Sequence, residues 1–78
     1  MRILLYGRLA ETIDRHIELD APHGWSVAEL RRRIAADHPA AADSLGRSRA
    51  CIGNAVVGDD HILSAGDDVE FLPPVSGG

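Results

Sequence analysis

Two short segments near the start of the chain show the alternation expected of strands. Residues 2–6 carry apolar side chains on both faces, as in a strand at the centre of a sheet. Residues 16–20 alternate polar and apolar positions, with Ile17 and Leu19 on the inward face of a half-buried strand. Residues 8–14, between them, have the spacing of a short helical turn. We therefore expect the chain to begin with a strand, a helical turn and a second strand.

The clearest helix signal begins at Ser26. This residue is a favourable N-cap, and Glu29 three positions later completes a capping box. Apolar residues then recur at helical spacing as far as His38. The residue before Pro39 avoids the helical region, so the helix is expected to end there. The consecutive arginines at residues 31–33 are expected to lie mostly on the outward face of the helix, in contact with water, and docking to a partner is the alternative.

The second half of the chain predicts further strands. Residues 50–57 are typical of one strand, interrupted by Gly53 and Asn54. Residues 69–72 are typical of the last strand, with Val69 and Phe71 pointing inward. A single amphipathic helix must bury its apolar stripe on one face of a sheet. The order of elements therefore predicts an α+β domain, with one main helix packed on a mixed sheet of four or five strands. This is the order of β-grasp, or ubiquitin-like, domains.

The composition narrows the possible partners. A chain of 78 residues forms one small domain, and domains of this size bury only about 60% of the surface that the unfolded chain exposes. Eight basic and twelve acidic residues give a net charge of −4, so nucleic acid is a poor partner and a basic protein surface is a better one. No apolar run approaches the roughly 18 residues of a membrane span, and the start of the chain does not resemble a signal peptide. We expect a cytoplasmic protein without a membrane partner.

Side chains that could perform catalysis or hold a metal do not form a recognisable set. The histidines are scattered without ligand spacing, and the acidic pairs at residues 59–60 and 67–68 coincide with turn signals. Cys51 falls in a predicted strand, which favours a buried and inert thiol. Neither a nucleophile elbow nor a glycine-rich phosphate loop is present. We therefore expect no metal site, no bound cofactor and no catalytic machinery within the chain.

The end of the chain carries the strongest functional signal. We predict a domain over residues 1–72 and an extended tail over residues 73–78. Its two prolines favour an extended backbone, which over six residues reaches about 18 Å. The last residues, Gly77 and Gly78, have no side chains and could thread a narrow channel. A frayed terminus is the alternative, but the tail follows a strand directly. We therefore interpret the carboxylate of Gly78 as a substrate for another protein's active site.

The same segment carries a family resemblance. Residues 67–78, ending in Phe-Leu-Pro-Pro-Val-Ser-Gly-Gly, resemble the C-terminal signature of the small subunits of molybdopterin synthase, the MoaD branch of the MoaD/ThiS sulfur carriers. Residues 3–11 resemble the first strand and turn of that family, and residues 26–30 resemble the start of its helix. The resemblance covers nearly the whole chain. It departs at Gly53-Asn54, where the family usually has Val-Asn.

The resemblance implies a subunit that donates sulfur but has no catalytic residues of its own beyond the C-terminal thiocarboxylate. In that family, an ATP-using activating enzyme adenylates the terminal carboxylate, here that of Gly78, and a sulfur donor converts it to a thiocarboxylate. The tail then enters the large synthase subunit and passes sulfur to cyclic pyranopterin monophosphate, which forms molybdopterin. The resemblance also implies a heterotetramer with the large subunit and ATP use by the partner alone. The tail residues inserted would be Pro73, Pro74, Val75, Ser76 and Gly77.

The strand pattern predicts a docking surface beside the tail. Leu4, Tyr6 and Leu72, together with Val56, are expected on the sheet face that lies away from the helix. Partial burial by loops is the alternative. Because exposed apolar patches on small proteins tend to be interfaces, we expect this surface to contact the activating enzyme and the large subunit in turn.

Other functions are compatible with the same features. The chain could carry sulfur for thiamine or cysteine synthesis, or it could be a ubiquitin-like modifier conjugated through Gly78. It could also be an interaction domain whose tail has no role. The double proline before Val-Ser-Gly-Gly favours the molybdopterin branch among these alternatives.

Overall fold

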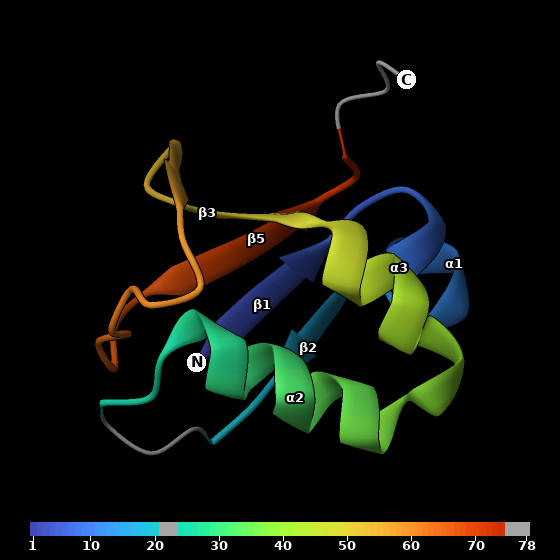
Figure 1. Ribbon diagram of the computed structural model, residues 1–78, viewed down its shortest axis with the longest axis horizontal. Coiled ribbons are helices and arrows are strands. Elements are labelled where there is room, and N and C mark those ends of the chain that lie inside the picture. Colours follow the sequence, from blue (N-terminus) through green and yellow to red (C-terminus); the bar gives the residue numbers. More distant parts are fainter. Residues whose placement is uncertain (21–23, 75–78) are drawn as a thin grey trace.

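The computed structural model describes residues 1–20 and 24–74, and in it one main helix lies across one face of a mixed sheet (Figure 1). Five strands form the sheet in the order β2-β1-β5-β3-β4. The central strands β1 and β5 are parallel, and the other neighbouring strands are antiparallel. This is the β-grasp arrangement. The strands are β1 (Arg2–Leu5), β2 (His16–Glu18), β3 (Arg49–Ile52), β4 (Ala55–Val57) and β5 (Asp68–Leu72). The helices are α1 (Arg8–Thr12), α2 (Val27–Asp37), the 3₁₀ turn η1 (Pro39–Ala41) and α3 (Ala42–Arg47).

The main helix α2 begins at the predicted capping box. The Ser26 hydroxyl accepts a hydrogen bond from the Glu29 backbone N–H at 3.2 Å, and Glu29 Oε1 accepts one from the Ser26 backbone N–H at 3.0 Å. The hydrogen bonds from the backbone and hydroxyl of Ser26 favour the charged carboxylate, so they lower the pKa of Glu29 below its ordinary value. Val27, Leu30 and Ile34 lie on the buried side of α2, as their spacing predicts.

The core lies between α2 and one face of the sheet. Alternate residues of the central strands point toward the helix, and the register pairs Ile3 with Val69 and Leu5 with Phe71. Phe71 is fully buried and is the largest of the buried side chains in the described residues. The predicted inward orientation of Val69 and Phe71 is therefore confirmed. The remaining residues of these strands point to the opposite face, which has no helix across it (Figure 1).

The prediction of one interrupted strand over residues 50–57 is wrong. The segment is a hairpin of β3 and β4, with Ile52 opposite Ala55 and a two-residue turn at Gly53-Asn54. The φ angles of Gly53 and Asn54 are 58° and 67°, the left-handed values that a tight hairpin of primed type needs. Glycine and asparagine tolerate these values best among the residue types. The pair therefore reverses the chain instead of interrupting a single strand.

The consecutive arginines mostly face water, as expected, and Arg31 is the exception. Arg32 and Arg33 are exposed, but the Arg31 side chain retains only 15% of its exposure. Its guanidinium donates hydrogen bonds to the Leu45 carbonyl oxygen, to Ser48 Oγ at 3.0 Å and to the Ser48 carbonyl oxygen at 2.9 Å. It also lies 5.2 Å from the centre of the Phe71 ring. Position 31 lies on the apolar stripe of α2, so its side chain meets the carbonyl groups at the end of α3.

Candidate functional site

The root of the tail leaves the sheet beside the turn that follows β1. Strand β5 ends at Leu72, and Pro73 and Pro74 continue from it as exposed residues. Pro73 lies against Gly7, where an added Cβ would come within 3.2 Å of the Pro73 Cγ. Gly7 also has a φ of 62°, which residues with side chains rarely adopt. The absence of a side chain at Gly7 therefore allows the tail root to pack against this turn.

The residues expected to enter a partner's active site are described only in part. The structure shows Pro73 and Pro74. The remaining predicted tail-insertion residues (Val75, Ser76, Gly77) and the predicted reactive residue Gly78 lie outside the described residues. Their roles stay predictions.

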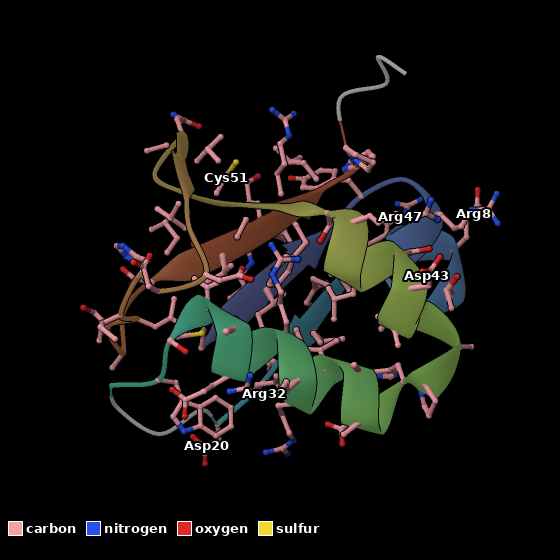
Figure 2. All side chains as sticks on the ribbon, viewed as in Figure 1. Arg8, Asp20, Arg32, Asp43, Arg47 and Cys51 are labelled. Atoms are coloured by element: carbon pink, nitrogen blue, oxygen red, sulfur yellow. The ribbon has the colours of Figure 1, made fainter. Side chains whose placement is uncertain are left out.

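A cavity of about 230 Å³ lies beside the tail root. Its walls come from Tyr6, from α1, from the end of α3 and from the two prolines, and the lining includes Arg8 and Arg47 but no acidic side chain. Arg47 pairs with Asp43 one turn earlier in α3 at 3.0 Å, and both side chains are largely exposed. Figure 2 shows Arg8, Asp43 and Arg47 at the end of the molecule formed by α1 and α3. The lining of the cavity therefore combines apolar side chains with two cationic groups.

The strand register places the predicted docking residues on one face of the sheet. Leu4 is opposite Glu70, Glu70 is opposite Cys51, and Cys51 is opposite Val56, so these four residues form one row across the sheet. Leu72 lies two residues from Glu70 along β5 and so points to the same face. We call Leu4, Tyr6, Val56 and Leu72 the far-face cluster. Leu4 and Leu72 are half-buried, whereas Val56 retains 61% of its exposure.

Tyr6 joins the far-face cluster through a hydrogen bond that the sequence analysis missed. Its hydroxyl donates to Glu70 Oε2 at 2.7 Å, and the side chain is 39% exposed. This hydrogen bond to the carboxylate, helped by desolvation and by the negative charge, raises the pKa of the Tyr6 phenol. The alternation along β5 could have placed Glu70 beside Leu72 on this face. The far-face cluster therefore shares this face with the carboxylate of Glu70 and with Arg49, which lies opposite Leu72, and its role in docking stays a prediction.

Three remaining features of the described residues are the single cysteine, the possible metal ligands and the possible membrane helices. Cys51 is buried in β3, as predicted, and carries a free thiol. Within residues 1–20 and 24–74, no group of three or more His, Cys, Asp or Glu side chains is placed to hold a metal ion. In the same part of the chain, no helix combines the length and apolar character needed to cross a membrane.

Comparison with known proteins places these features in context. Residues 3–78 match the ThiS family. The chain is 32% identical over 80 aligned positions to a protein of Escherichia coli K12 named molybdopterin synthase sulfur carrier subunit, and the alignment covers 100% of this chain and 99% of that protein.

Solved structures share the fold at lower identity. SAMP1 from Haloferax volcanii superimposes with a TM-score of 0.81 at 22% identity, covering 99% of this chain and 97% of that one. A putative molybdopterin converting factor subunit 1 from Pyrococcus furiosus gives 0.82 at 22% identity, covering 95% of each chain. A complex of subunits 1 and 2 of the molybdopterin-converting factor from Helicobacter pylori gives 0.68 at 22% identity, covering 99% and 96%. These similarities confirm the β-grasp fold.

Proposed function

The chain belongs to the ThiS family, and from this premise we propose that it is a sulfur carrier that holds sulfur as a thiocarboxylate on Gly78. The observation that carries the proposal is the 32% identity to the Escherichia coli sulfur carrier subunit over the full length of both chains. The double proline that follows β5 supports it, because prolines favour an extended backbone at the start of the arm that would carry the terminal carboxylate.

The proposed chemistry uses catalytic groups of other proteins. A carboxylate is a poor electrophile, so an activating enzyme first transfers AMP from ATP to the Gly78 carboxylate and releases pyrophosphate. Sulfur at the oxidation level of sulfide then attacks the carbonyl carbon, and AMP leaves with its electron pair. The product is a thiocarboxylate, whose sulfur is a nucleophile. This chain contributes the arm and the surface on which its partners dock, and ATP is the activating enzyme's substrate.

We assign the carrier to molybdopterin synthesis. The arm would enter the large synthase subunit and pass sulfur to cyclic pyranopterin monophosphate. The Escherichia coli relative is named a subunit of molybdopterin synthase, and the Helicobacter pylori structure is a complex of two molybdopterin-converting-factor subunits. A heterotetramer with the large subunit is the assembly we propose. Small archaeal modifier protein 1 of Haloferax volcanii also shares this fold, but the full-length sequence identity favours the carrier over a modifier.

The far-face cluster is the proposed docking surface. Val56 retains 61% of its exposure without a partner, so its burial in a complex would stabilise the complex. Val56→Asp and Leu72→Asp should each weaken binding to the large subunit at least about tenfold, because a carboxylate would be buried in an apolar contact. Ile62→Asp is the matched control, since Ile62 is 58% exposed but lies outside the cluster. If all three variants bind the large subunit with equal affinity, the far-face cluster is not part of the interface.

Intact mass spectrometry tests the carrier role directly. Protein purified from its native host should include a species in which one C-terminal oxygen is replaced by sulfur, and incubation with the activating enzyme, ATP and a sulfur donor should increase it. A variant lacking Gly78 should show neither species and should fail to restore molybdoenzyme activity in a deficient strain. Full restoration by that variant would refute the proposal. A ladder of conjugates on an immunoblot of host lysate would favour the modifier instead.

A further inference from the structure

We propose that the cavity at the tail root is a receptor for an acidic side chain of the activating enzyme, with Arg8 and Arg47 as its cationic contacts. This inference rests on the proposed function, because it concerns the protein that receives the tail. It adds a charged contact to the apolar far-face cluster.

The position of the cavity ties it to the tail. Pro73 and Pro74 form part of its wall, and Tyr6 belongs both to its lining and to the far-face cluster. A protein that engages the tail where it leaves the sheet therefore covers the mouth of this cavity. The cavity is continuous with the surface already proposed for docking.

The charges at the cavity define the chemistry of the occupant. Arg8 and Arg47 come from different helices and line the same cavity, whereas the chain as a whole has a net charge of −4. The Asp43 carboxylate lies 3.0 Å from the Arg47 guanidinium and offsets the charge of that group. Ser44, also in the lining, adds a hydroxyl group that can donate to an oxygen, whereas the Ser48 hydroxyl already donates to the Leu45 carbonyl oxygen. A carboxylate side chain fits this combination, because guanidinium groups bind carboxylates with charge-assisted hydrogen bonds.

The exposure of these groups favours the activating enzyme over the large subunit. The Arg47 side chain retains 68% of its exposure, so its pairing gains little free energy and is weakened by salt. Contacts of this kind mainly raise the association rate, while apolar contacts hold a complex together. A carrier has to leave its activating enzyme in every cycle. A charged contact at the rim therefore suits that transient complex.

The chain supplies a closely matched control for the test. Arg33 pairs with Asp37 one turn later at 3.0 Å, just as Arg47 pairs with Asp43, and Arg32 is exposed like Arg8. Arg32 and Arg33 lie on α2 and are not part of the cavity lining; Figure 2 shows Arg32 away from the α1–α3 end. The double variants Arg8→Glu/Arg47→Glu and Arg32→Glu/Arg33→Glu therefore change the net charge equally and remove equivalent ion pairs.

Stopped-flow association with the cognate activating enzyme is the decisive measurement, after circular dichroism has shown that both variants are folded. The cavity variant should associate at least about tenfold more slowly than wild type at low salt, and the difference should shrink between about 50 and 300 mM salt. The control variant should stay within about threefold of wild type. The control variant should also keep the wild-type rate of thiocarboxylate formation, whereas the cavity variant should need a higher enzyme concentration to reach half of its maximal rate. Replacing the facing Asp or Glu of the activating enzyme with Lys should restore the association rate of the cavity variant.

The outcomes separate this inference from the proposed function. If wild-type protein forms the thiocarboxylate but the two double variants associate at equal rates, the receptor is refuted and the carrier role stands. If wild-type protein is never loaded with sulfur, the proposed function fails first. Self-association of wild-type protein that is lost in the cavity variant would assign the cavity to a second copy of this chain and would overturn the proposal.

Discussion

The contacts of Arg31 predict an unusually strong stability effect for a charged helix residue. Its guanidinium joins α2 to the end of α3 through the Leu45 carbonyl and both oxygens of Ser48, and to Asp59 at 2.9 Å. Arg31→Met keeps the length and the apolar stem of the side chain and removes the donors. Arg32→Met makes the same change one residue later, at an exposed position of the same helix.

The size of the effect follows from the partners. Hydrogen bonds to charged groups contribute about 1.5–3 kcal/mol each when buried, but those to Ser48 and Leu45 share one guanidinium and are not additive. The Asp59 side chain is 63% exposed, so its ion pair with Arg31 adds little to the free energy of unfolding. The contact with the Phe71 ring adds about 0.5–1 kcal/mol. We expect Arg31→Met to lower the free energy of unfolding by about 2–4 kcal/mol, after allowance for the packing of methionine.

Thermal unfolding followed by circular dichroism measures this loss. For a domain of this size, each kcal/mol corresponds to about 6 °C in Tm. Arg31→Met should therefore unfold about 12–24 °C below wild type, and Arg32→Met within about 3 °C of it. If the two variants have the same Tm, the Arg31 guanidinium does not stabilise the junction between α2 and α3 in the way these contacts indicate.

Three further predictions concern Gly7 and the capping box of α2. Gly7→Ala should lower the free energy of unfolding by about 1–3 kcal/mol, because residue 7 has a positive φ. It should also slow thiocarboxylate formation, because the added Cβ would displace Pro73. Gly46→Ala is the control and should not destabilise the domain, because Gly46 lies in α3 with open space where the Cβ would be. Ser26→Ala should cost about 1 kcal/mol by removing the N-cap. The lowered pKa of Glu29 makes the charged carboxylate stabilising above its unfolded pKa of about 4.3, so the Tm advantage of wild type over Glu29→Gln should disappear as pH falls below that value. A Tm advantage that is constant from neutral to acidic pH would contradict the role of the charge.

The features that sequence reasoning predicted correctly are those set by local signals. The start of α2 follows from Ser26 and Glu29 alone, because both partners of the capping box lie within one turn. The inward positions of Val69 and Phe71 follow from strand alternation. The hairpin at Gly53-Asn54 can also be predicted from local sequence, because two residues that tolerate positive φ separate two apolar runs. The prediction of a single strand missed it, because apolar residues on both sides of the turn also fit one continuous strand over residues 50–57.

The features that were missed depend on residues distant in the sequence. The acceptors that draw Arg31 inward lie 14, 17 and 28 residues away, and a run of three arginines carries no sign of them. The cavity likewise requires α1, α3 and the tail root to meet, and no spacing along the chain brings Arg8 and Arg47 together. The sequence therefore predicted the tail and the face beside it, whereas the charged contacts around the tail root appear only in the fold.

The path of Pro73 and Pro74, the tail root, is set by the sheet from which they leave. Pairing continues to Phe71 on the β1 side and to Leu72 on the β3 side, so the chain leaves the sheet only after its last paired residue. Pro73 then packs against Gly7. Since Ser26 lies at the start of α2, away from this exit, Ser26→Ala should lose stability but keep the wild-type rate of thiocarboxylate formation per folded molecule. Gly7→Ala should reduce that rate even at temperatures where it is fully folded, because its Cβ alters the path of the tail and not only the stability of the domain.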